Sequence, residues 1–160
     1  IDSVMDIYYR QQKTKKILGG VRLNKYKHLK DKHQNEFNSF PCFFAFNKKQ
    51  FNEGMKKLGL NPDNTDKIYR GIGGMFYKKS DSQKLKDMLN RHDKELEEAI
   101  KNDKTGEGFI FDMFYYELSN HEYGYTYELD DTLDCLGLTL DDVMSRENLL
   151  NGLNKAKNMF

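Results

Sequence analysis

Apolar residues recur along the chain in patterns that predict helices joined to a few short strands. The clearest pattern follows Asn47, where apolar side chains fall three and four residues apart on one helical face: Phe51, Met55 and Leu58. Asn47 can cap this helix, and Gln50 can complete a capping box. We therefore predict a helix that stops at Gly59.

Longer apolar patterns predict the remaining helices. Residues 82–100 show an amphipathic stripe, and residues 109–118 are apolar around most of a helical circumference, which predicts a central buried helix. Further helices are expected before Pro41, around residues 129–136, after Thr139, and over the last residues of the chain.

Strands are expected where apolar runs are short or alternate with small residues. Cys42–Phe46 and Met75–Lys78 are predicted strands, and Tyr123–Tyr127 is predicted as a third strand or an extended loop. The fold class is therefore α+β, a mostly helical single domain with about five helices on a small two- or three-stranded sheet. We assign residues 1–35 to a basic N-terminal arm with the start of the first helix, and residues 36–160 to the domain.

One hydrophobic core is predicted for this domain. It should contain apolar residues from each of its main elements: Phe44, Phe46, Phe51, Leu89, Ile110, Phe114 and Leu133.

Composition places the chain among globular proteins. It is 38% hydrophobic, 13% aromatic and 32% charged, which argues against disorder. No apolar run approaches the roughly 18 residues that cross a bilayer, and no secretory signal is visible. Cys42 and Cys135 lie far apart in apolar surroundings, so two buried thiols are expected. We predict a cytoplasmic protein without membrane contact.

Charge is distributed unevenly along the chain. Residues 107–147 carry eleven Asp or Glu against one Arg. Part of this segment is also rich in tyrosine, and tyrosines among carboxylates can anchor a basic protein partner. The predicted partner-binding residues, here called the acidic tyrosine face, are Glu122, Tyr123, Tyr125, Tyr127, Asp130, Asp131, Asp141 and Asp142. A solvated acidic edge without a partner is the alternative.

The first 35 residues carry nine Lys or Arg against three Asp. Lys and Arg neutralise phosphates, so a second hypothesis is a nucleic-acid-binding accessory factor. Its candidate contacts are Arg10, Lys13, Lys15, Lys16, Arg22, Lys25 and Lys27.

A third hypothesis is a metal-dependent enzyme. Glu117 and His121 share a helical face, and Glu122 follows them, so the three could hold a metal ion. No second ligand motif completes the site, and a structural role for His121 at the helix end is the favoured interpretation. The sequence therefore predicts no cofactor and favours a protein without enzymatic activity.

Five segments carry a resemblance that covers about three quarters of the chain, from about Glu36 onward: 43–46, 51–60, 66–69, 117–123 and 136–139. They resemble an uncharacterised family of accessory proteins carried by phages and conjugative elements of Gram-positive gut bacteria. The resemblance implies a protein of a mobile element, where inhibitors of host defence proteins are common. It implies no activity and no catalytic residue.

Overall fold

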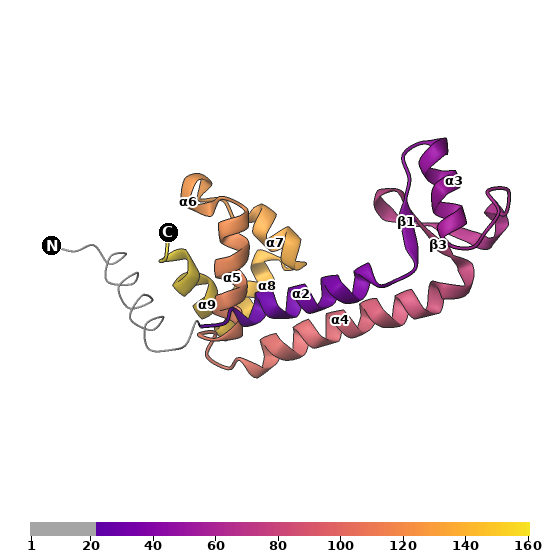
Figure 1. Ribbon diagram of the computed structural model, residues 1–160. Coiled ribbons are helices and arrows are strands. Elements are labelled where there is room, and N and C mark those ends of the chain that lie inside the picture. The colour runs from indigo at the N-terminus through magenta and orange to yellow at the C-terminus, as the bar shows by residue number, and fades with distance from the viewer. Residues whose placement is uncertain (1–21) are drawn as a thin grey trace. The chain divides into compact units, whose positions relative to one another are not determined.

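The computed structural model describes residues 22–160, which divide into two compact units (Figure 1). We call residues 33–95 the sheet unit, and residues 22–32 with 96–160 the helical unit. Helices α2 (Lys25–Asn38) and α4 (Ser82–Asn102) each contribute residues to both. The sequence predicts one domain over residues 36–160, and the contacts group the described chain into two compact units.

The sheet unit contains a three-stranded antiparallel sheet in the order β1-β3-β2. The strands are β1 (Cys42–Phe44), β2 (Ile68–Arg70) and β3 (Met75–Lys78), and Phe43 on β1 pairs with Phe76 on β3. Three short 3-10 helices flank them: Thr65–Lys67, Ile72–Gly74 and Lys79–Asp81. The small sheet is confirmed, but its third strand is β2 instead of Tyr123–Tyr127.

Helix α3 (Lys48–Lys57) packs against β1, as Figure 1 shows. The predicted cap is confirmed, because the Asn47 side chain accepts the backbone N–H of Gln50. The core between α3 and the sheet is formed by Phe43, Met55, Leu58 and Ile68. Gly54 is required on α3, since a Cβ atom there would lie 2.0 Å from a ring carbon of Phe43.

Three residues predicted for the core are exposed, and all three belong to the sheet unit. Phe44 is 51% exposed because side chains alternate along β1 and only Phe43 faces α3. Phe46 is 79% exposed, since it follows the strand and its backbone N–H is held by the Gln50 side chain. Leu89 is also exposed, and Phe51 is half-buried against the core.

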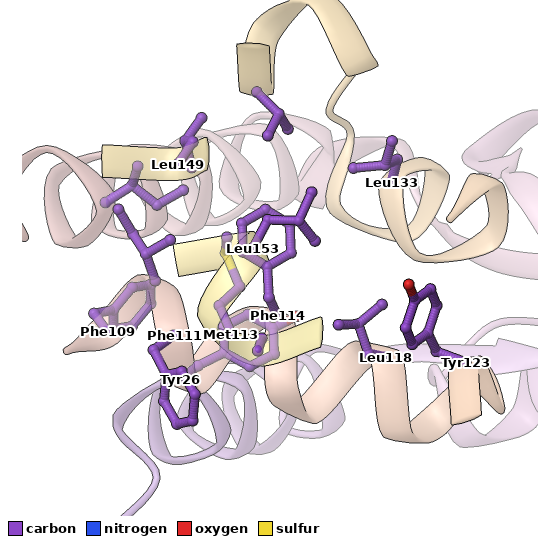
Figure 2. Packing of buried hydrophobic residues seen from close by; sticks show 14 residues of the cluster. Tyr26, Phe109, Phe111, Met113, Phe114, Leu118, Tyr123, Leu133, Leu149 and Leu153 are labelled. Carbon is purple, nitrogen blue, oxygen red and sulfur yellow. The ribbon is translucent and has the colours of Figure 1, made fainter. Parts of the chain in front are cut away.

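The helical unit is built around α5 (Phe109–Asn120), most of whose residues are buried. It packs on α9 (Glu147–Lys157), and the core between them contains Phe114 and Leu153 (Figure 2). The close approach depends on Gly152, where a Cβ atom would lie 2.4 Å from a side-chain carbon of Ile110. The predicted burial of Ile110, Phe114 and Leu133 is confirmed.

Three short helices complete the unit: α6 (Tyr123–Thr126), α7 (Asp130–Leu136) and α8 (Leu140–Ser145). Residues 22–160 thus hold eight α-helices instead of about five. The predicted strand at Tyr123–Tyr127 is wrong because left-handed residues at 122 and 127 bracket one helical turn. In this turn Tyr123 is buried, whereas Tyr125 and Tyr127 are exposed. Within residues 22–160, every helix is too short or too polar to cross a membrane.

Candidate functional site

The most unusual group of the helical unit is the carboxylate of Glu117 on α5, which is only 1% exposed. Its Oε1 atom accepts a hydrogen bond from the Tyr26 hydroxyl at 2.6 Å and another from the Lys30 ammonium at 2.5 Å. Both donors lie on α2. Its Oε2 atom accepts a longer hydrogen bond from the Asn120 amide at 3.4 Å and lies 3.6 Å from Nε2 of His121.

These contacts keep Glu117 ionised. Burial raises the pKa of its carboxyl group, but the hydrogen bonds from Lys30 and Tyr26 outweigh burial, and the net pKa lies below the usual value. Burial and the Glu117 carboxylate raise the pKa of the Tyr26 hydroxyl. Partial burial lowers the pKa of Lys30, yet its hydrogen bond to Glu117 makes the net shift upward. The result is an ion pair between a buried carboxylate and a partly exposed ammonium, with further hydrogen bonds to the carboxylate from Tyr26 and Asn120.

Cys135 on α7 joins this group, a neighbour that sequence reasoning missed. One ligand atom each of Glu117, His121 and Cys135 lie within 4.8 Å of one another. Cys135 is exposed, so the expectation of a buried thiol is wrong there, and Cys42 is half-buried. Burial and then the Glu117 charge raise the pKa of the Cys135 thiol, which opposes a role as an activated nucleophile. No spacing signal relates Cys135 to α5, because the turn at residues 121–129 brings α7 back.

Glu122, the third residue of the sequence-predicted metal site, does not join the cluster found among the described residues. Its backbone is left-handed, with φ of 55°, and its side chain is exposed. His121 ends α5 as predicted, and its backbone N–H donates to the Glu117 carbonyl at 2.9 Å. The structure therefore exchanges Glu122 for Cys135 in the candidate ligand set.

Not every residue of the acidic tyrosine face is exposed to solvent. Tyr125 on α6 is 89% exposed and Tyr127, which caps the end of α6, is 67% exposed, but Tyr123 is buried and its ring meets those of Tyr127 and Phe160. Tyr123 therefore anchors the face from beneath and is not available to a partner.

The carboxylates of the face are exposed: Glu122, Asp130, Asp131, Asp141 and Asp142. Asp142 also has a structural role, because it forms a reciprocal capping box with Thr139 at the start of α8. Hydrogen bonds from the Thr139 side chain and backbone lower the pKa of Asp142.

Two of the three nucleic-acid candidates within the described chain, Arg22 and Lys27, form side-chain ion pairs, whereas the Lys25 side chain is exposed. Arg22 forms an ion pair at 2.7 Å with Asp112, a buried residue of α5, and the backbone N–H of Lys25 donates to the same carboxylate at 3.0 Å. Lys27 pairs with Asp31 at 2.5 Å. The other candidates lie outside the described residues: Arg10, Lys13, Lys15 and Lys16.

The chain belongs to the DUF7659 family, a family of unknown function, whose sequence model matches residues 25–159. The match begins at α2, earlier than the resemblance from about residue 36. No curated protein and no solved structure matches the chain significantly.

Proposed function

We propose that this member of a family of unknown function is a non-enzymatic binding protein that engages a basic surface of another protein through its acidic tyrosine face. The observation that carries the proposal is the pair Tyr125, on α6, and Tyr127, at its C-terminal cap, which are both exposed among exposed carboxylates. Residues 122–145 contain seven Asp or Glu and no Lys or Arg.

Physical chemistry supports a binding role for such a surface. Tyrosine supplies a large contact area with few side-chain torsions to immobilise, and it is enriched at the energetic centres of interfaces. The surrounding carboxylates would attract a basic partner and exclude an acidic one. Tyr125 and Tyr127 are thus the proposed anchors, and the carboxylates set the partner's charge.

The backbone of α6 gives a second argument. Glu122 and Tyr127 hold φ angles of 55° and 56°, a region that costs a non-glycine residue about 1–2 kcal/mol. Strain of this kind persists where surrounding contacts fix it, and it is concentrated at functional sites. Here the buried Tyr123 ring supplies the fixing contacts, and the strained turn presents Tyr125.

We extend the proposal to the cell compartment and the genetic element in which the protein acts. We place the protein in the cytoplasm, as an accessory protein of a mobile genetic element and an inhibitor of a host defence protein. The resemblance to accessory proteins of phages and conjugative elements supports this setting, and an inhibitor without catalytic groups would act by such a surface.

A photo-crosslinking amino acid at position 125 tests the function in cells of the source organism. We expect one discrete protein adduct, and no equivalent adduct when the crosslinker replaces Tyr69, a half-exposed tyrosine of the sheet unit. The identified partner should then bind the Tyr125→Ala variant at least tenfold more weakly, with the Tyr69→Ala variant unchanged.

Two results would reject this function. One is a partner whose affinity is unchanged by Tyr125→Ala and by the double reversal Asp130→Lys with Asp131→Lys. The other is co-purification of nucleic acid with the protein that is lost when residues 1–21 are deleted. That result would favour nucleic-acid binding by the basic N-terminal arm.

A further inference from the structure

We propose that Glu117, His121 and Cys135 bind a divalent cation of the zinc class. The three side chains come from α5 and α7 of the helical unit and present one oxygen, one nitrogen and one sulfur within 4.8 Å of one another. This site is separate from the tyrosines of α6 on which the proposed function rests.

On Glu117, Oε1 accepts both short hydrogen bonds, and Oε2 carries only the longer one from the Asn120 amide at 3.4 Å, so Oε2 is the oxygen available to a cation. Tyr26 and Lys30 both donate to Oε1, at 2.6 and 2.5 Å. Oε2 is the atom that lies 3.6 Å from His121 Nε2. A carboxylate held this way resembles many metal ligands, whose second oxygen is fixed by hydrogen bonds from neighbouring groups.

The separations suit a tetrahedral ion. Bonds of about 2.0–2.3 Å to oxygen, nitrogen and sulfur put tetrahedral ligands about 3.3–3.7 Å apart. The 3.6 Å between Glu117 Oε2 and His121 Nε2 lies just above the about 3.3–3.5 Å expected for an oxygen–nitrogen pair, so a small side-chain adjustment would bring both atoms to bonding distance. The Cys135 sulfur lies within 4.8 Å of both atoms, and its exposed side chain is free to change rotamer about the Cα–Cβ bond.

The ligand types select the ion. Mg²⁺ and Ca²⁺ prefer all-oxygen sites, whereas imidazole and thiolate favour zinc and its neighbours in the transition series. Binding would convert the Cys135 thiol to thiolate and release its proton to solvent. Three protein ligands leave a fourth position for water or a group of a partner, and the exposure of Cys135 and half-exposure of His121 place that position toward solvent.

The Lys30 ammonium is the main positive charge that would repel a bound cation. It lies on Oε1, on the other oxygen from the proposed ion, and it balances the Glu117 carboxylate inside the protein. A cation would therefore be matched chiefly by the Cys135 thiolate. This balance predicts that zinc binds with the ion pair intact, instead of displacing Lys30.

Zinc and cobalt titrations of the tag-free full chain test the site. We expect one Zn²⁺ per chain, and a Co²⁺ complex with sulfur-to-cobalt charge-transfer absorption and the intense visible bands of tetrahedral cobalt. The Cys135→Ser variant should lose the charge-transfer band and bind zinc at least tenfold more weakly, and His121→Gln should weaken binding similarly. Cys42→Ser is the matched control, since Cys42 has no ligand cluster among the described residues, and it should bind as the parent does.

Folding is monitored by circular dichroism of each metal-free variant, and both ligand variants should melt close to the parent because Cys135 is exposed and His121 half-exposed. The proposal is overturned if the parent binds no zinc, or if Cys135→Ser and His121→Gln retain parental affinity, which would mean an adventitious ion only. Neither result bears on partner binding through Tyr125, so the two proposals can fail independently.

Discussion

The imidazole rings of His33 and His92 stack face to face in the sheet unit, with centroids 3.9 Å apart and planes inclined by 11°. Each ring is hydrogen bonded to a carboxylate of the opposite helix, His33 to Glu95 and His92 to Glu36, both at 2.8 Å. Arg91 also donates to Glu36 at 2.7 Å. The ends of α2 and α4 that belong to the sheet unit are therefore joined by a network of hydrogen bonds.

This network predicts that the free energy of unfolding falls in acid because Glu36 becomes protonated. Hydrogen bonds from Arg91 and then His92 lower the pKa of Glu36 from 4.5 to about 2. A carboxyl with a lowered folded-state pKa contributes stability above its unfolded value, and that contribution is lost as pH falls. Urea unfolding of the parent and Glu36→Gln should therefore differ most above about pH 4.5, and the difference should shrink as pH falls toward 2.

The control for this experiment is Glu98→Gln, which removes an exposed carboxylate of α4. A parent-minus-variant difference for Glu36 that stays constant between pH 6 and 2 would contradict the predicted linkage.

Phe114 should be one of the most costly positions to truncate. Its side chain is fully buried in the core between α5 and α9, so Phe114→Ala should lower the free energy of unfolding by about 3–5 kcal/mol. Tyr125→Ala, an exposed aromatic truncation, should change it by less than about 0.5 kcal/mol. Urea denaturation measures both, and equal stability of the two variants would remove Phe114 from the core.

Tyr26 and His121 both approach Glu117, and metal-free variants should separate their roles. Tyr26→Phe removes a hydrogen bond of 2.6 Å to a buried carboxylate and should cost about 1–3 kcal/mol. His121→Ala should cost less than about 1 kcal/mol, because the His121–Glu117 distance is 3.6 Å and the ring is half-exposed. The sequence favours a structural His121, and a larger loss for His121→Ala than for Tyr26→Phe would support that interpretation.

Two glycines of the sheet unit should respond differently to a side chain. Gly54→Ala forces a Cβ atom against Phe43, and the overpacking should destabilise the protein by about 1–3 kcal/mol despite better helix propensity. Gly59 has φ of +70° and open space around it, so Gly59→Asn should cost less than about 1 kcal/mol. Thermal unfolding measures both, and a stabilised Gly54→Ala would show that Phe43 can move aside.

Local chemistry explains which elements could be predicted from the sequence. Caps depend on neighbouring residues, so Asn47 and Thr139 were identified as helix starts from sequence alone. The continuous apolar pattern of α5 likewise indicated its burial. These features needed no knowledge of distant contacts.

The remaining features depend on contacts between distant residues. The alternation Tyr123, Tyr125, Tyr127 is typical of a strand, but left-handed backbone at two non-glycine residues bends it into α6, and residue type gives no signal for that. Cys135 meets Glu117 only because α7 returns over α5, so the sequence could not exchange it for Glu122. β2 was missed because Ile68–Arg70 is too short to show alternation.

The discontinuity of the helical unit has a consequence for synthesis. Glu117 meets Tyr26 across 91 residues of chain, and the whole sheet unit is encoded between them. Residues 33–95 therefore emerge from the ribosome before α5 is synthesised. The sheet unit can fold at that stage, before Glu117 is available to Tyr26 on α2. Early folding of the sheet unit would shorten the flexible loop between Tyr26 and Glu117. Less conformational entropy would then be lost when the Tyr26 hydroxyl reaches the Glu117 carboxylate.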